Sequence, residues 1–209
     1  MTQLRVSPTL ALPLDAATES FGILGQRGAG KSNVEVVFAE ELWKVRIPWV
    51  AIDPKGDWHG IRSSADGRGP GLPIPVIGGL HGDVPLEAAS GSYVADLLID
   101  QELTAVLDVS QFSQADLARF LIAFCHRLFA RHQADPHVRV VIFEEAHRYI
   151  PQSVTGATAA LKDGDALEKF CRVWRQRRPS YRHPSPLSES ERGGEPTRIS
   201  ATDFAGFSA

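Results

Sequence analysis

Cysteine and long apolar runs are scarce in this chain, and each shortage excludes a class of protein. Its 209 residues include 2 cysteines, Cys125 and Cys171, and neither has a metal-ligating neighbour at a useful spacing, so reduced thiols are expected and a disulfide or metal site is not. No apolar run is long enough to cross a membrane. The N-terminus also lacks the basic and apolar blocks of a secretory signal, which predicts a cytoplasmic location.

Excess positive charge is missing as well. The formal net charge of −3 predicts no overall attraction to nucleic acid, so a DNA-binding role would need a local basic patch or a ring of subunits. What the chain does have is 43% hydrophobic residues over 209 positions. That is enough for one α/β domain with a buried core.

Glycine is concentrated in residues 25–32, Gly-Gln-Arg-Gly-Ala-Gly-Lys-Ser, which fit the phosphate-loop pattern G-x-x-x-x-G-K-[ST] at every fixed position. The apolar residues 20–24 before the loop predict a buried strand, and the apolar spacing after it predicts a helix over 31–44. In that context backbone N–H groups converge on phosphate oxygens, Lys31 reaches the outer phosphates and Ser32 ligates Mg²⁺. The alternative is a glycine-rich turn that binds nothing.

The remaining pattern predicts an α/β fold with a mostly parallel central sheet, because buried strands alternate with helices. We expect an edge strand or extended lead-in over 5–15 beside the nucleotide pocket, because its prolines cannot donate to a strand ladder. The other expected elements are a buried strand at 48–53, a loop-rich insertion over about 62–86 with one strand near 74–77, a helix at 90–99, a buried strand at 104–109, a long amphipathic helix capped by Ser113, and a strand at 140–143.

Two strand ends carry polar residues that we expect on the same rim as the phosphate loop. The first strand ends in Asp53-Pro54-Lys55-Gly56, which either acts near Mg²⁺ or nucleic acid or simply makes the turn. The last ends in Glu144 and Glu145. Since strand side chains alternate, these carboxylates should point in different directions, one holding Mg²⁺ through water and the other orienting the attacking water. The alternative is that the two glutamates have no chemical role and only end the strand.

Three stretches together resemble the HerA branch of the HerA/FtsK superfamily of ring-forming ATPases. They are residues 25–32, Ile-Asp-Pro-Lys-Gly-Asp-Trp at 52–58 and Phe-Glu-Glu-Ala-His-Arg-Tyr-Ile-Pro at 143–151, and the similarity covers roughly 5–178. The resemblance implies a RecA-like P-loop NTPase of the additional-strand-catalytic-glutamate type, a three-layer sandwich that is incomplete at the C-terminus.

The resemblance also implies the site residues. ATP would be bound by Gly25, Gln26, Arg27, Gly28, Ala29, Gly30, Lys31, Ser32 and Asn33. Ser32 and Glu144 would hold Mg²⁺, while Glu145 and Lys31 would be catalytic. His147 resembles a histidine that links nucleotide state to neighbouring loops. The family usually has Asp where Glu144 stands. The extra methylene of Glu displaces the carboxylate that would position Mg²⁺, so the resemblance implies ATP binding more strongly than ATP hydrolysis.

The implied activity is ATP hydrolysis coupled to translocation or unwinding of double-stranded DNA. By resemblance the assembly would be a homo-oligomeric, hexameric ring with a possible partner nuclease and no membrane contact. The alternative is a truncated, hydrolysis-poor ATP-binding module, or a non-functional gene product. DNA-stimulated ATP turnover distinguishes the two interpretations.

The sequence leaves the family's pattern after Arg178, where an apolar strand and a Ser-Gln-Arg motif are expected but serine, proline and charge follow. We therefore expect a domain over 1–178 and a disordered tail over 179–209. The favoured explanation is a shifted reading frame, because suitable codons for 180–183 and 187–189 encode Val-Thr-Ala-Thr and Ser-Gln-Arg one nucleotide later. The alternative is a natural tail with a basic arm at 172–182 that contacts DNA phosphates. Sequencing the gene past Arg178 decides between them.

Overall fold

The computed structural model describes residues 3–26 and 28–148. Arg27, Cys171 and the tail expected at 179–209 lie outside the described residues. In chain order the elements are β1 Gln3–Arg5, β2 Ala11–Pro13, a 3-10 helix at Leu14–Thr18, α1 Lys31–Lys44, β3 Trp49–Asp53, a 3-10 helix at Trp58–Arg62, β4 Val76–Gly78, α2 Gly91–Asp100, β5 Ala105–Asp108, α3 Gln114–Ala134, β6 Val140–Phe143 and a 3-10 helix at Ala146–Arg148.

A parallel sheet with the strand order β4-β5-β3-β6 forms the centre of the molecule. In β3, Ile52 is in register with Leu107 of β5 on one side and with Phe143 of β6 on the other. The carboxyl ends of these three strands therefore lie together at one edge of the sheet. The predicted α/β class and parallel pairing are confirmed.

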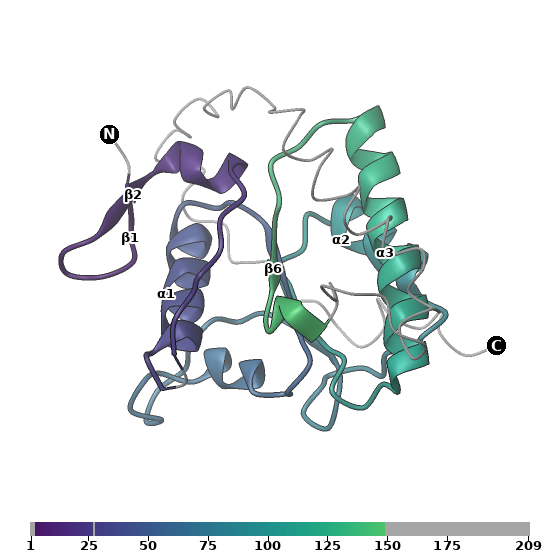
Figure 1. Cartoon of the computed structure of the whole chain (residues 1–209), viewed down its shortest axis with the longest axis horizontal. Coiled ribbons are helices and arrows are strands. Elements are labelled where there is room, and N and C mark those ends of the chain that lie inside the picture. Colours follow the sequence, from purple (N-terminus) through teal and green to yellow (C-terminus); the bar gives the residue numbers. More distant parts are fainter. Residues whose placement is uncertain (1–2, 27, 149–209) are drawn as a thin grey trace.

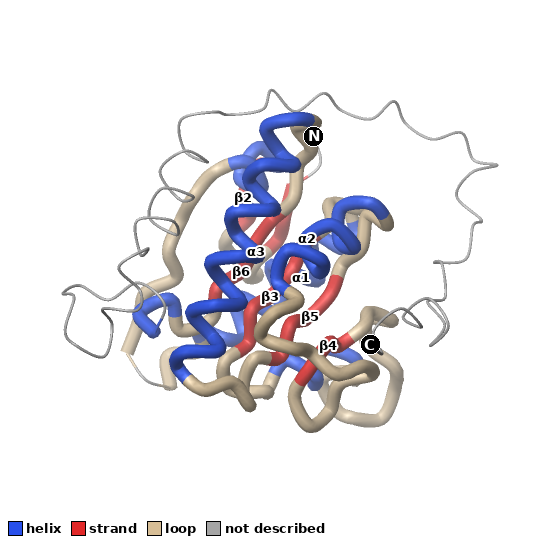
Figure 2. Tube along the Cα trace, turned by 90° about the vertical axis from the view of Figure 1, so that its right-hand side faces the viewer, coloured by secondary structure: helices blue, strands red, loops and turns tan. Residues whose placement is uncertain are grey.

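Helices cover both faces of this sheet, which makes three layers (Figures 1 and 2). Because strand side chains alternate, Val50 and Ile52 of β3 pack toward α2 and α3, whereas Trp49 and Ala51 pack toward α1. Continuous apolar strands such as β3, buried along its whole length, are typical of sheets covered on both faces.

Local signals set the bounds of the helices well. The predicted cap of α3 is confirmed, since the Ser113 hydroxyl accepts the Asp116 N–H at 3.2 Å. The apolar stripe of α3 is core, with Phe120 and Phe124 both 0% exposed. Cys125 on the same helix is a buried free thiol.

The N-terminal segment differs from the prediction of an edge strand or extended lead-in beside the nucleotide pocket. β1 and β2 form an antiparallel hairpin that lies on the outer side of α1 (Figure 1). The Arg5 N–H donates to Glu41 Oε2 at 2.7 Å, and Leu4 packs in the same cluster as Leu42. These contacts tie the hairpin to the later half of α1 and not to the loop before it.

The strand predicted at 20–24 is wrong. These residues have no strand conformation, and Phe21 and Leu24 are 50% and 94% exposed. An apolar run becomes a strand only when another strand supplies hydrogen bonds along its edge. Among the described residues β6 is the last strand of the sheet order, and nothing there pairs with 20–24.

Within the described part of the chain, no helix combines the length and apolar character that a membrane crossing requires.

Close packing of α2 on α3 depends on Gly91. A Cβ at this position would collide with the Phe120 carbonyl oxygen and lie 2.9 Å from the Phe124 nitrogen. We expect Gly91→Ala to lower the free energy of unfolding by about 1–3 kcal/mol, because the helices must separate. Urea unfolding followed by circular dichroism measures this.

Gly60→Ala is the matched control, since a Cβ at Gly60 would meet no atom within 4 Å. Its unfolding free energy should stay within about 0.5 kcal/mol of the wild type. Equal losses in both variants would contradict the packing explanation.

Candidate nucleotide-binding site

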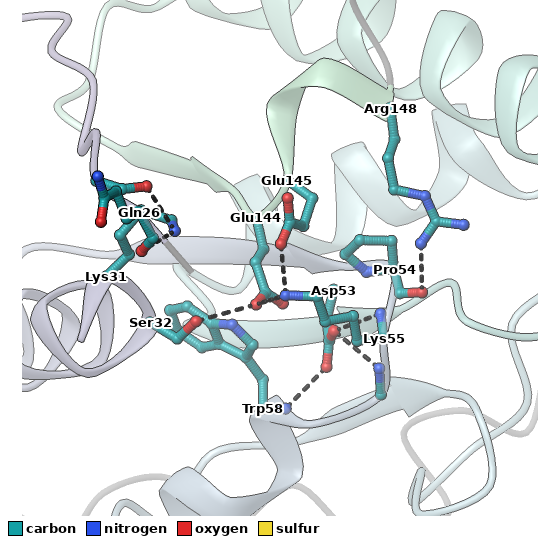
Figure 3. A network of polar contacts seen from close by, with 12 residues as sticks. Gln26, Lys31, Ser32, Asp53, Pro54, Lys55, Trp58, Glu144, Glu145 and Arg148 are labelled. Carbon is teal, nitrogen blue, oxygen red and sulfur yellow. Dashed lines mark hydrogen bonds and ion pairs between the residues drawn. The ribbon is translucent and has the colours of Figure 1, made fainter. Parts of the chain in front are cut away.

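Two glycines before α1 have the backbone angles that make glycine useful in a phosphate loop. Gly28 and Gly30 adopt φ values of 80° and 85°, in the left-handed region that favours glycine. The Lys31 ammonium folds back over the loop and donates to the carbonyl oxygens of Gly25 at 3.0 Å and Gln26 at 3.2 Å. The Lys31 side chain thus lies against the backbone of Gln26 (Figure 3).

The start of α1 supplies donors for an anion. The first turn of an α-helix leaves N–H groups without helical partners, and the helix dipole is positive there. Ser32 and Asn33 occupy this turn and are exposed. Phosphate oxygens are the group that such a loop and helix start can bind.

Glu144 connects this turn to the sheet. The Ser32 hydroxyl donates to Glu144 Oε1 at 3.4 Å across 112 residues of sequence. The Glu144 N–H continues the β3–β6 pairing by donating to the Ile52 carbonyl at 3.3 Å, which places its side chain, only 4% exposed, beside the helix start. The structure therefore brings together the predicted phosphate loop and the first predicted carboxylate.

The expectation that Glu144 and Glu145 point apart is wrong. Both carboxylates contact the Lys55 ammonium, at 3.0 Å and 2.7 Å respectively (Figure 3). The alternation of a strand holds only while the strand continues, and β6 ends at Phe143. Glu145 adopts a φ of 50°, and this left-handed turn directs its side chain back to the same cation.

The two readings of the Asp53–Gly56 segment apply to different residues. Asp53 makes the turn: its carboxylate is 0% exposed and accepts the N–H groups of Lys55, Gly56 and Trp58 at 2.8–2.9 Å. Lys55 instead sends its side chain into the site. The rim expected from the strand ends is therefore present.

The charges at the rim are strongly linked. Burial raises the pKa of the Glu144 carboxyl above its ordinary value, against the hydrogen bond from Lys55, and the nearby Asp53 charge raises it further. The hydrogen bonds that the Lys55 ammonium donates to Glu145 and Glu144 raise the pKa of Lys55. The lysine therefore stays charged and offsets part of the negative charge.

The oxygens of Ser32 and Glu144 fit a Mg²⁺ ion. Mg²⁺ takes oxygen ligands in an octahedron whose neighbouring oxygens lie about 3 Å apart, close to the 3.4 Å between Ser32 Oγ and Glu144 Oε1. Glu144 Oε2 is buried and has no hydrogen-bond partner among the described residues. Such a buried, unpaired carboxylate oxygen favours a cation.

Glu35 belongs to the site, although the sequence reading did not single it out. Burial raises the pKa of Glu35 to about 7, and the Glu144 charge adds to the effect. The signal was helical spacing, because Glu35 follows Lys31 by one turn on the same face of α1. The side chain of His147, by contrast, lies outside what the structure describes.

A parallel sheet covered on both faces, with a glycine-rich loop leading into α1 at the rim where β3 and β6 end, defines a P-loop NTPase-like domain. Residues 5–182 match the family described as "Helicase HerA, central domain", and the chain belongs to this family. No curated protein and no solved structure matches the chain.

Glu35 should make stability depend on pH. Its pKa is higher in the folded protein, about 7 against 4.5, so the folded state binds the proton more tightly and stability falls as pH rises through this window. Glu35→Gln removes that titration. We expect the variant to gain melting temperature over the wild type at about pH 8 and to gain less at about pH 5.

Glu41→Gln on the same helix is a control of opposite sign. Although burial acts the other way, hydrogen bonds from Lys44 and Arg5 hold the pKa of Glu41 below its ordinary value, so its charge stabilises the folded state above that pKa. Glu41→Gln should therefore lose melting temperature at about pH 8. The same pH trend in both variants would refute the assignment.

Proposed function

We propose that this chain is the ATP-binding core of a HerA-type ATPase that couples ATP hydrolysis to DNA translocation or unwinding. The observation that carries the proposal is the meeting of Ser32 and Glu144, 3.4 Å apart, at the end of a phosphate loop in a chain of the HerA family. Neither feature alone specifies an ATPase, but their juxtaposition has the chemistry of an Mg²⁺–nucleotide site.

Each residue has a definite part in this proposal. The loop and the first turn of α1 bind the phosphates, and Lys31 exchanges the Gly25 and Gln26 carbonyls for the outer phosphate oxygens. Ser32 and Glu144 would hold Mg²⁺, which supplies positive charge to the phosphates being separated. Glu145 orients the attacking water and draws its proton, and its position is kept by the left-handed turn.

The wider assembly is also part of the proposal. Family membership supports a homo-oligomeric ring, hexameric by resemblance, that acts on double-stranded DNA in the cytoplasm, with a possible partner nuclease. A net charge of −3 gives one subunit no general affinity for DNA, so a ring that gathers local basic groups suits this chain better than a monomer.

A second candidate is an ATP-binding module with little hydrolysis. Lys55 engages one oxygen of each carboxylate, so in this conformation a cation already occupies part of the Glu145 carboxylate. Glu144 also stands where the resemblance leads us to expect the shorter aspartate. Both observations bear on turnover and leave nucleotide binding intact.

Two substitutions separate binding from turnover. We expect Lys31→Ala to weaken ATP binding at least tenfold, because the phosphates lose their cation. Glu145→Gln should keep ATP binding and lower the turnover rate by roughly 10²-fold or more, because an amide cannot take the proton. Equilibrium binding of a fluorescent ATP analogue and steady-state phosphate release, with and without double-stranded DNA, measure these effects.

Lys44→Ala at the opposite end of α1 and Glu87→Gln on an exposed loop are the matched controls and should behave like the wild type. DNA-stimulated turnover that both site variants lose supports the motor. ATP binding without turnover in the wild type supports the module, and absence of ATP binding would reject both.

A further inference from the structure

Lys55 is the one cation that the structure places between the two glutamates of the described site. Its ammonium lies 3.0 Å from Glu144 Oε1 and 2.7 Å from Glu145 Oε1, from a loop 89 residues earlier in the chain. The same Glu144 Oε1 accepts from Ser32 at 3.4 Å. The lysine thus contacts the very oxygen that faces the helix start.

The loop that carries Lys55 is firmly anchored. Asp53 accepts three of its N–H groups, and the Arg148 guanidinium, which follows the glutamates in the chain, donates to the Pro54 carbonyl at 3.0 Å (Figure 3). The backbone is therefore held at the strand end and again from the 3-10 helix that follows β6. Only the side chain of Lys55, which is 37% exposed, is free to move away into solvent.

Resting on the proposed function, we propose that Lys55 is a positioning residue whose ammonium stands in for the divalent cation until nucleotide arrives. It neutralises Glu144 and Glu145 and holds them together. A divalent cation bound by Ser32 and Glu144 would lie next to this ammonium and repel it. Loading of the metal therefore expels Lys55 from Glu144.

The exchange also affects Glu145. The ion pair with Lys55 holds this glutamate while its backbone is in the left-handed region, a conformation unfavourable for a residue with a side chain. When Lys55 leaves Glu144, its hold on Glu145 weakens too. Lys55 in this way links the arrival of the metal to the availability of the carboxylate assigned to the water.

A merely structural ion pair makes the opposite prediction for metal affinity. If Lys55 only shapes the rim, its removal disorders the carboxylates and weakens divalent cation binding. If it competes with the metal, its removal leaves Glu144 and Glu145 unneutralised and strengthens binding. The sign of the change therefore separates the two roles.

The experiment compares Lys55→Met, which keeps the length and removes the charge, with Lys55→Arg, which keeps the charge. Mn²⁺ binding without nucleotide, followed by electron paramagnetic resonance, is the first readout. We expect Lys55→Met to bind Mn²⁺ about tenfold more tightly. This is the lower end of the range by which one adjacent charge changes an ionic equilibrium. Lys55→Arg should stay within about twofold of the wild type.

Lys44→Met is the matched control, because Lys44 pairs with Glu41 at the far end of α1 and should leave Mn²⁺ affinity unchanged. Circular dichroism checks that each variant is folded. Unchanged or weaker Mn²⁺ binding by folded Lys55→Met would overturn the proposal.

A measurement on the wild type does not depend on any variant. Acetylation of lysines by acetic anhydride, read by mass spectrometry, should modify Lys55 several-fold faster once Mg²⁺ and ADP are present, because the ammonium is released. Faster Lys55 labelling with the Mn²⁺ result confirms the exchange, and unchanged labelling despite nucleotide binding rejects it. If the wild type binds no nucleotide, the proposed function fails, whereas the Mn²⁺ comparison still tests Lys55.

Discussion

The parallel pairing of β3 with β6 is the constraint on which the site depends. It places the carboxyl ends of two segments that are 90 residues apart at one rim, with Ile52 opposite Phe143. The residues that follow these strands, Lys55 on one side and Glu144 on the other, then meet within hydrogen-bonding distance. A one-residue slip of β6 would turn its side chains to the opposite face and separate the pair.

The rim combines charges that would be unfavourable singly. Glu144 is nearly buried, and burial opposes its ionisation. The negative charge of Glu144 is partly compensated on one side by the Lys55 ammonium, the Ser32 hydroxyl and the start of α1. A metal ion would compensate this charge more fully. Glu35, whose pKa burial raises to about 7, adds a further carboxylate to the same region. The arrangement is therefore one that a cation and a phosphate group would both stabilise.

Local sequence patterns predicted much of the fold but only part of the candidate site. The bounds of α1 and β6, the Ser113 cap and the buried strand β3 follow from spacing, capping and apolar runs, and the structure confirms them. The strand at 20–24 failed because strand formation needs a partner, which a local pattern does not reveal. The role of Lys55 was left open because its partners lie far along the chain. Glu35 was missed although its spacing from Lys31 is local, because its burial and its closeness to Glu144 depend on the tertiary structure.

The sequence by itself determined the chemistry on offer: a glycine loop able to adopt left-handed angles, a lysine and a serine at the helix start, and two glutamates after an apolar strand. The tertiary structure alone decided how these groups meet. Glu145 has a φ of 50°, so its carboxylate contacts Lys55 together with that of Glu144. The Asp53 carboxylate instead accepts backbone N–H groups of the turn. Residue type sets which interactions a group can form, but only the packing of strands and loops sets the distance at which it forms them.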